Sequence, residues 1–197
     1  QVLAPMGIQR MQIGASLANR RAEGEVRYYL SRKSTAASVF GDATQKVPWP
    51  DGGFCLETMD SHGGWIASAV DLARFAAALD DPRRCPVLSG GSLRAMYDPP
   101  PAPVSRNRVG QLDDTYYGCG WMVRPIGQSR SANYWHNGSL PGTFALLVRR
   151  WDGLSWAVLF NQRSEDIKLP DAAIDRALHR AVDSVTEWPK EDGFEKA

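Results

Sequence analysis

One nine-residue segment, Tyr134–Gly142, is the densest group of residues in this sequence that could do chemistry. Within it His136 is followed by Asn137, Gly138 and Ser139. A histidine titrates near neutral pH, so it can exchange protons or contact a carboxylate. We predict that His136 ends a strand, where backbone N–H groups without ladder partners could bind a developing oxyanion. A tight turn that carries a partly exposed histidine would explain the same residues.

Other candidate residues have simpler structural explanations. The Gly63-Gly64-Trp65 triplet could form the aromatic side of a substrate cleft. A turn with the tryptophan in the core explains the same residues. His62 has no cysteine or histidine at metal-ligand spacing, and His179 lies among charged residues typical of a solvated helix face. We expect Arg149-Arg150 to be a surface pair. The sequence therefore predicts no metal site and no cofactor.

The sequence contains no recognisable attacking residue. It has no Gly-x-Ser-x-Gly, no phosphate-binding Gly-x-x-x-x-Gly-Lys-Ser/Thr and no Ser-x-x-Lys. Ser131-Ala132-Asn133 has the form Ser-x-Asn, but it lies in or beside a predicted strand and we attribute it to chance. The chain thus carries parts of a reaction site without a nucleophile.

Composition narrows the class of protein. The 197 residues include 23 Lys and Arg against 22 Asp and Glu, a formal net charge of +1 that leaves no basic excess for a nucleic-acid partner. No apolar run reaches the length of a membrane span. Cys55, Cys85 and Cys119 allow at most one internal disulfide, so the sequence fixes neither the redox compartment nor the localisation.

The first half of the chain reads as loops and helices. Glu25–Leu30 predicts a short strand, and the Gly- and Pro-rich segment 41–64 predicts loops. Ser68 and Ser89 have the position of helix caps, which predicts helices from Ala69 to Leu79 and from about residue 90 to Tyr97. A proline-rich connection over residues 99–114 predicts a boundary near residue 110.

The second half reads as a sheet followed by a helix. Aromatic and β-branched residues predict four strands, at Tyr117–Val123, Ala132–His136, Thr143–Trp151 and Leu154–Asn161. Asp152-Gly153 predicts a type I′ hairpin turn between the last two. Asp171 should cap a terminal helix whose apolar stripe needs a sheet to cover.

These elements predict an α/β fold of the α+β type. An antiparallel sheet of about four strands, covered by the C-terminal helix, should occupy residues 111–197. A loop-rich helical lobe should precede it at residues 1–110, and we expect the two parts to form one incomplete domain.

Four stretches in order resemble the C-terminal half of the serine β-lactamase-like superfamily, which includes class C β-lactamases, DD-peptidases, D-aminopeptidases and related esterases. They are Pro5-Met6-Gly7, the segment 63–75, Tyr117-Gly118-Cys119-Gly120-Trp121 and the segment 135–142. The likeness covers roughly residues 1–187. It implies a partial β-lactamase/transpeptidase-like fold.

The resemblance also implies roles for individual residues. In the family a Ser-x-x-Lys serine attacks a carbonyl, a Tyr-x-Asn or Ser-x-Asn element assists proton transfer, and a Lys-Thr-Gly or His-x-Gly strand lines the opposite wall. His136-Asn137-Gly138 matches the last element, which implies that the Ser139 N–H is an oxyanion donor and that His136 contacts the substrate carboxylate or the acyl-transfer machinery. Trp135, Asn137 and Gly138 would then bind a small-molecule or peptide substrate. A histidine in place of lysine favours peptidase or esterase chemistry.

The family's nucleophile and Tyr-x-Asn elements have no counterpart in these 197 residues. We therefore expect the C-terminal portion of a serine hydrolase, inactive alone, which associates with itself or with a missing N-terminal half. The alternative is a non-catalytic binding or interaction domain that keeps the hydrolase scaffold. Trp65, Trp121 and Trp135 suggest this alternative, because aromatic residues are favoured at recognition surfaces.

Overall fold

A computed structural model of the protein describes residues 1–30, 34–101, 114–127, 131–163 and 171–191. The chain divides into two compact units. Unit 1 comprises residues 1–13, 65–138 and 145–159, and unit 2 comprises residues 14–64, 139–144 and 160–197. The boundary predicted near residue 110 lies outside the described residues.

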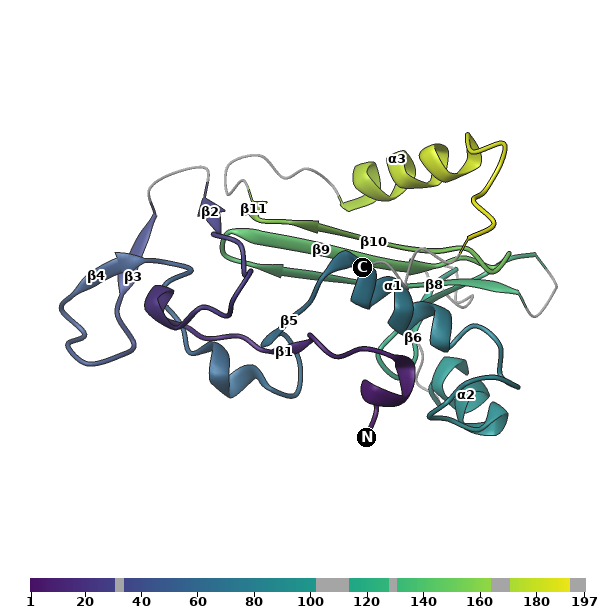
Figure 1. Cartoon of the computed structure of the whole chain (residues 1–197), viewed down its shortest axis with the longest axis horizontal. Helices are drawn as coiled ribbons and strands as arrows, with labels where there is room; N and C mark the ends of the chain where they lie inside the picture. The colour runs from purple at the N-terminus through teal and green to yellow at the C-terminus, as the bar shows by residue number, and fades with distance from the viewer. Residues whose placement is uncertain (31–33, 102–113, 128–130, 164–170, 192–197) are drawn as a thin grey trace. The chain divides into compact units, whose positions relative to one another are not determined.

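A five-stranded antiparallel sheet, in the order β10-β9-β8-β7-β6, is the largest sheet of the described chain (Figure 1). Its strands are β6 (Tyr116–Tyr117), β7 (Met122–Pro125), β8 (Ala132–Leu140), β9 (Thr143–Arg149) and β10 (Ser155–Phe160). Together with the helices it confirms the predicted mixed α/β class and the antiparallel sheet. The sheet has five strands rather than about four.

The additional strand arises from a tight turn inside the segment that we predicted as one strand. The Gly118 N–H donates to the Trp121 carbonyl at 2.8 Å, and Gly120 adopts a φ of 83°, which a residue with a side chain rarely tolerates. Tyr117 consequently pairs with Met122 instead of preceding it on the same strand. The prediction of a single strand over residues 117–123 was wrong because both glycines were read as strand residues.

Strand β8 continues to Leu140, so the prediction that it ends at His136 was wrong. The chain reverses at Pro141 and Gly142, where Gly142 takes a φ of 80°. Asn137-Gly138 could also have turned, but the Pro-Gly pair fixes φ at the proline and allows a positive φ at the glycine. His136 therefore lies within a strand.

The predicted hairpin between β9 and β10 is present, with a different turn. The Arg150 N–H donates to the Leu154 carbonyl at 2.7 Å, and Gly153 has a φ of 87°. Among the described residues only glycines have positive φ, so Asp152 does not adopt the conformation that a type I′ turn requires. A three-residue loop ending in a glycine replaces the predicted two-residue turn.

Both predicted helices of the first half are confirmed. Helix α1 spans Ala69–Ala78 and helix α2 spans Gly90–Tyr97. The Ser68 hydroxyl accepts the Asp71 N–H at 3.1 Å and donates to the Asp71 carboxylate at 2.8 Å, while the Ser89 hydroxyl accepts the Ser92 N–H. The predicted terminal helix is α3, Asp171–Asp183, which begins at Asp171 itself.

The core of unit 1 forms where α1 and α2 pack with strands of the sheet. Trp121 is only 4% exposed and stacks on Phe75 of α1, with 6.5 Å between ring centroids. The buried residues of this cluster are Met6, Ile8, Ala76, Leu79, Leu93, Trp121, Val123, Ala132 and Leu147. Trp121 is therefore a core residue and not part of a recognition surface.

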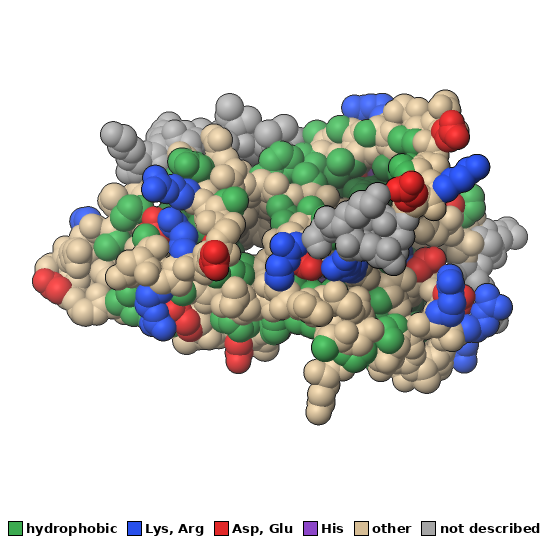
Figure 2. All heavy atoms as spheres, in the orientation of Figure 1, with side chains coloured by type: hydrophobic (Ala, Val, Ile, Leu, Met, Phe, Trp, Pro, Cys, Tyr) green, Lys and Arg blue, Asp and Glu red, His purple; other side chains and the backbone are tan. Residues whose placement is uncertain are grey.

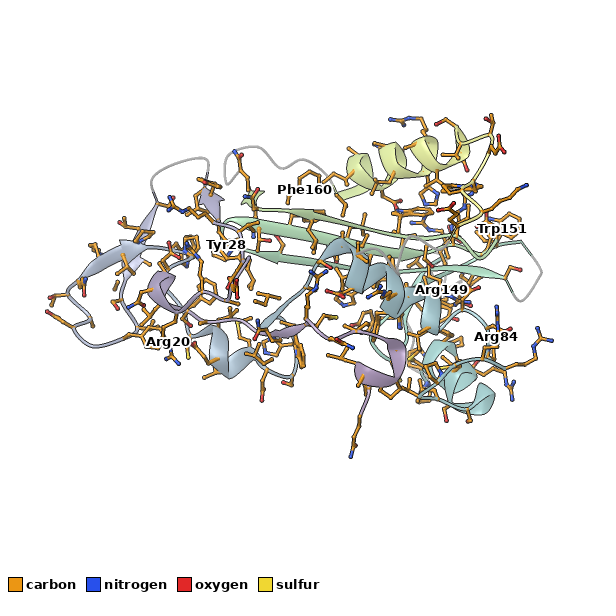
Figure 3. The ribbon with its side chains drawn as sticks, in the orientation of Figure 1. Arg20, Tyr28, Arg84, Arg149, Trp151 and Phe160 are labelled. Atoms are coloured by element: carbon orange, nitrogen blue, oxygen red, sulfur yellow. The ribbon has the colours of Figure 1, made fainter. Side chains whose placement is uncertain are left out.

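Unit 2 contains short strands joined by loops. Strand β2 (Tyr29–Leu30) pairs in parallel with β11 (Gln162–Arg163), and β3 (Thr35–Ala37) pairs with β4 (Lys46–Pro48). The predicted strand over residues 25–30 shrinks to its last two residues, because the Glu25 carboxylate accepts hydrogen bonds from the Ala22 N–H and the Tyr28 hydroxyl, both at 2.9 Å. Figure 3 labels Tyr28.

The remaining elements are a strand pair and three short 3-10 helices. Strand β1 (Gln12–Ile13) pairs with β5 (Trp65–Ile66), and the 3-10 helices are η1 (Ala4–Met6), η2 (Ala18–Arg20) and η3 (Leu56–Met59). None of the helices described here is long and apolar enough to cross a membrane. On the face drawn in Figure 2, basic and acidic side chains are interspersed.

Candidate functional site

Both ring nitrogens of His136 have hydrogen-bond partners in unit 1. Nε2 lies 2.9 Å from the hydroxyl oxygen of Tyr117, on β6, and Nδ1 lies 2.7 Å from the carbonyl oxygen of Asn137. The Tyr117 and His136 rings meet edge to face, with centroids 5.8 Å apart. Both side chains are exposed to solvent, Tyr117 at 50%. The structure thus joins His136 to a tyrosine nineteen residues away in the sequence.

The register of β8 with β7 ends one residue before His136. The last register pair joins Met122, the first residue of β7, to Trp135. The Ile126 N–H donates to the Ser131 carbonyl at 2.9 Å, so alternation directs the backbone groups of Asn137 and Ser139 toward the edge of β8 next to β7. The N–H of Ser139 therefore points to the β7 side of β8, beyond the end of β7.

The other residues expected at the site flank His136 on β8. Trp135 is half-buried, and the guanidinium carbon of Arg124 lies 4.9 Å from its ring centroid. Asn137, Gly138 and Ser139 are exposed. A Cβ built on Gly138 would lie 3.7 Å from the Ala145 side chain, an ordinary contact. The five predicted residues are thus consecutive on one strand, most of them accessible.

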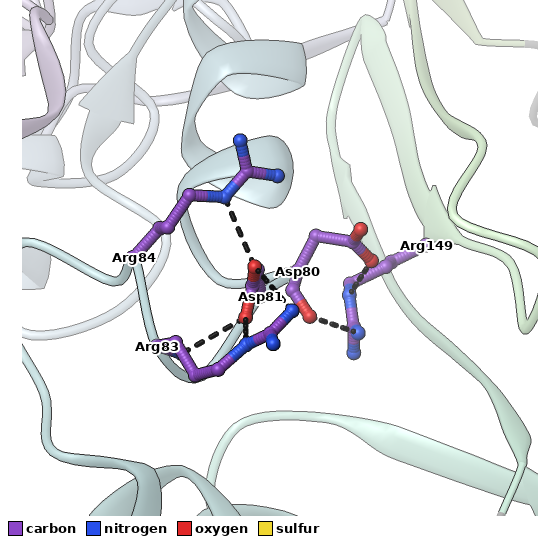
Figure 4. A network of polar contacts seen from close by, with 5 residues as sticks. All are labelled: Asp80, Asp81, Arg83, Arg84 and Arg149. Carbon is purple, nitrogen blue, oxygen red and sulfur yellow. Dashed lines mark hydrogen bonds and ion pairs between the residues drawn. The ribbon is translucent and has the colours of Figure 1, made fainter.

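Just before this segment on β8, Tyr134 is held by an aromatic and ionic cluster. Its ring centroid lies 4.2 Å from that of Tyr97, and the Arg149 guanidinium carbon lies 4.8 Å from the Tyr134 centroid and 5.5 Å from that of Tyr97. Arg149 donates to the Asp80 carboxylate at 2.9 Å and to its backbone carbonyl at 3.0 Å (Figure 4). The Arg149 side chain is only 13% exposed, so the prediction of a surface pair was wrong.

Burial also changes the titration of Tyr97. It raises the pKa of Tyr97 to about 12, although the neighbouring positive charge of Arg149 opposes the shift. The Tyr97 hydroxyl has no hydrogen-bond partner among the residues that the structure describes. The cluster therefore favours a neutral Tyr97 packed against a charged Arg149.

A second buried polar centre lies in unit 2, around Ser16, which is 2% exposed. Its hydroxyl donates to the Glu57 carboxylate and accepts the Leu56 N–H at 2.6 Å, while its own N–H donates to Glu57 at 3.1 Å. The hydrogen bond from the Ser16 hydroxyl lowers the pKa of Glu57 to about 2. A serine held by an ionised carboxylate and a backbone donor joins two loops and is not arranged as an activated nucleophile.

The remaining candidates belong to segments other than β8. His62 is exposed in unit 2, and His179 Nε2 lies 3.5 Å from Asp175 on the same helix. Trp65 is 44% exposed, so it is not the core residue of the simpler explanation. Across the described ranges no group of three or more His, Cys, Asp or Glu side chains could hold a metal ion. The three cysteines are free thiols.

The sequence had not assigned a role to Tyr117. It belonged to one of the stretches on which the resemblance rests, but no local pattern indicated a contact with His136. Only the β6-β7-β8 register brings the two side chains together.

A family model described as Beta-lactamase matches residues 1–180. No curated protein matches the chain. Among solved structures, the D-amino acid amidase of Ochrobactrum anthropi SV3 complexed with D-phenylalanine is similar, with a TM-score of 0.60 and 22% identity over 93% of this chain and 51% of that chain. The penicillin binding protein of Bacillus halodurans has a TM-score of 0.60 and 16% identity, covering 92% of this chain and 46% of that chain.

An octameric penicillin-binding protein homologue from Pyrococcus abyssi is also similar, with a TM-score of 0.54 and 19% identity over 92% of this chain and 36% of that chain. These likenesses concern the fold. The chain spans about half the length, or less, of the solved structures that it matches.

Proposed function

Since the chain belongs to the beta-lactamase family, we propose that it supplies one wall of the acyl-transfer site of a serine hydrolase that cleaves amides or esters. The observation that carries the proposal is the exposed segment His136–Ser139, which continues along β8 after its pairing with β7 has ended. A strand segment of this kind presents the Ser139 N–H and the His136 ring to a bound substrate.

The Ser139 N–H has the role of an oxyanion donor in this proposal. An N–H directed at the oxygen of a tetrahedral intermediate stabilises charge that develops only in the transition state, and one such donor typically contributes about 3–4 kcal/mol to lowering the barrier. His136 contacts the substrate carboxylate or the group that transfers the proton. Beside His136, the substrate contacts Trp135, Asn137 and Gly138.

The attacking hydroxyl comes from polypeptide outside these 197 residues. No Ser-x-x-Lys occurs within them, and the buried Ser16 is occupied by Glu57 and a backbone N–H. Asn133, in the triplet of the form Ser-x-Asn, accepts the Trp151 N–H at 3.1 Å, which supports a structural role. The 197 residues alone are therefore inactive, because an oxyanion site without a nucleophile retains only residual catalysis.

The substrate is a small amide, an ester or a peptide. A D-amino acid amidase and penicillin-binding proteins are among the solved structures of similar fold, so D-amino acid amides and peptides ending in D-residues are the first compounds to try. A histidine instead of a lysine in the strand motif supports peptidase or esterase activity over cephalosporin hydrolysis.

Covalent labelling tests this proposal. The product of the complete reading frame and the 197-residue chain are each treated with a fluorescent fluorophosphonate and a fluorescent penicillin, and the labelled residue is mapped by mass spectrometry. We expect label on a serine that precedes residue 1, followed three residues later by lysine, and none on the 197-residue chain. Label on any serine within residues 1–197 would refute the proposal.

A non-catalytic binding domain is the second candidate, and the exposure of Trp65 at 44% favours it. Titration with D-Ala-D-Ala peptides or peptidoglycan fragments, followed by tryptophan fluorescence, separates the two candidates. A saturable change abolished by Trp65→Phe, together with no covalent labelling of the complete protein, supports the binding domain. If no ligand changes the tryptophan fluorescence, the binding-domain candidate is excluded.

A further inference from the structure

The two hydrogen bonds of the His136 ring determine where its proton lies. The Asn137 carbonyl oxygen, 2.7 Å from Nδ1, can only accept a hydrogen bond, so Nδ1 must carry hydrogen. In neutral imidazole the other nitrogen is then an acceptor. The Tyr117 hydroxyl, 2.9 Å from Nε2, consequently donates its proton to that lone pair. This arrangement is the opposite of the Nε2–H tautomer that imidazole side chains prefer in water.

Tyr117 is held in place by its neighbours although its ring is half exposed. On one side of it, the Tyr116 hydroxyl donates to the Tyr97 carbonyl, at the end of α2, at 2.8 Å. On the other side the Cys119 N–H donates to the Met96 carbonyl at 2.9 Å. A Cβ on Gly118 would lie 2.6 Å from that same Met96 oxygen, so the turn after Tyr117 packs directly on the α2 backbone.

We propose that Tyr117 is a positioning residue for His136. The Tyr117 hydroxyl holds the neutral imidazole in its Nδ1–H tautomer and fixes the ring orientation on the part of β8 that continues beyond its register with β7. As a contribution to catalysis this rests on the proposed hydrolase function. The hydroxyl itself need not touch the substrate. Without it, Nε2 would be free to take up hydrogen, and the ring would sample the other tautomer and other orientations.

Solution NMR tests the proposal on the protein without substrate. The ring ¹⁵N shifts of neutral His136 are read at a pH well above the ordinary histidine pKa, and His136→Gln assigns its signals, since the chain has three histidines. The wild type should show mainly the Nδ1–H tautomer. Tyr117→Phe should lower the ratio of Nδ1–H to Nε2–H by about three- to tenfold, the factor that one hydrogen bond supplies.

Tyr29→Phe is the matched control, because Tyr29 is also half exposed, at 52%, and lies in a short strand far along the chain from His136. It should leave the His136 signals unchanged, and neither substitution should move those of His62 and His179. A wild-type His136 that is mainly the Nε2–H tautomer, or a ratio unchanged by Tyr117→Phe, would overturn the proposal.

Kinetics of the complete protein separate this proposal from the proposed function. If the protein hydrolyses an amide or ester, Tyr117→Phe should lower kcat/KM by about tenfold. The loss appears as a lower kcat if His136 acts on the transferred proton, and as a higher KM if His136 contacts the substrate carboxylate. An unchanged kcat/KM would overturn the positioning role even with the tautomer confirmed. Absence of any hydrolysis or labelling would instead refute the hydrolase proposal, while the tautomer result would stand on its own.

Discussion

Replacing Arg149 by methionine should destabilise the protein by about 3 kcal/mol. Arg149 is 13% exposed and makes two hydrogen bonds to Asp80, one to the carboxylate and one to the backbone carbonyl. It also lies over the rings of Tyr97 and Tyr134. Methionine keeps most of the apolar stem but none of these polar contacts.

The magnitude follows from the exposure of each partner. The Asp80 side chain is 34% exposed and would regain water, so we assign the charged hydrogen bond about 1 kcal/mol instead of the larger value of a buried pair. The bond to the Asp80 carbonyl adds about 1 kcal/mol, and the two cation–π contacts add about 0.5 kcal/mol each. Together these losses amount to about 3 kcal/mol.

Urea unfolding followed by tryptophan fluorescence measures this loss. Arg83→Met is the matched control: the Arg83 side chain is 90% exposed in its ion pair with Asp81, so its removal should leave the denaturation midpoint close to that of the wild type. An Arg149→Met protein whose free energy of unfolding lies within about 1 kcal/mol of the wild type would show that the Tyr97–Tyr134–Arg149 cluster does not stabilise the fold in this way.

Three further substitutions test the scaffold. Ser68→Ala should lower the free energy of unfolding in urea by about 1–2 kcal/mol, because it removes the α1 cap and one hydrogen bond of Asp71, which is 1% exposed. A loss below about 0.3 kcal/mol would contradict this role of Ser68. Tyr97→Phe should leave stability at pH 8 within about 0.5 kcal/mol, since the hydroxyl has no partner among the described residues. Because the pKa of Tyr97 is raised from 10.0 to about 12, the wild type should lose stability as pH rises between those values, and the variant should lose less; parallel pH profiles would refute this. Gly118→Ala should shift the β6–β7 turn and destabilise the protein by about 1–3 kcal/mol, because its Cβ would lie 2.6 Å from the Met96 oxygen; a wild-type denaturation midpoint would contradict the packing.

Local chemistry explains which elements the sequence predicted well. Helices α1 and α2 begin after serines whose hydroxyls accept N–H groups of the first turn, and prolines follow α2 at residue 99. A cap and a stop act within a few residues, so they can be read without knowledge of the fold. Strand β9 could also be predicted from the sequence, because the length and composition of its apolar run are typical of a buried strand.

Glycines gave the errors, because their neighbours decide whether a glycine turns or extends. Gly138 stays extended in β8, while Gly120 and Gly142 adopt positive φ. The proline before Gly142 favours a turn there, but nothing in the immediate sequence distinguishes Gly120 from Gly138. The turn at Gly118–Trp121 depends on packing against Met96, 22 residues earlier than Gly118. Such long-range contacts override local preference.

The candidate site was predictable only in part. His136 could be singled out from its own segment and from the family resemblance, and the resemblance also drew attention to Ser139. Tyr117 could not, since its contact with His136 exists only through the register of three strands. The burial of Arg149 was hidden for the same reason: its partner Asp80 lies 69 residues away.

The most direct test of the account is the kcat/KM of the complete protein for a D-amino acid amide or a p-nitrophenyl ester after His136→Ala. His179→Ala serves as the control, because His179 lies on α3 with its ring near Asp175. A residue that assists proton transfer or positions the reacting group contributes about 10²- to 10⁴-fold, so His136→Ala should lower kcat/KM by at least about 10²-fold while His179→Ala leaves it unchanged. Equal activity of the His136→Ala and wild-type proteins would contradict the claim that the His136–Ser139 segment forms a wall of the reaction site.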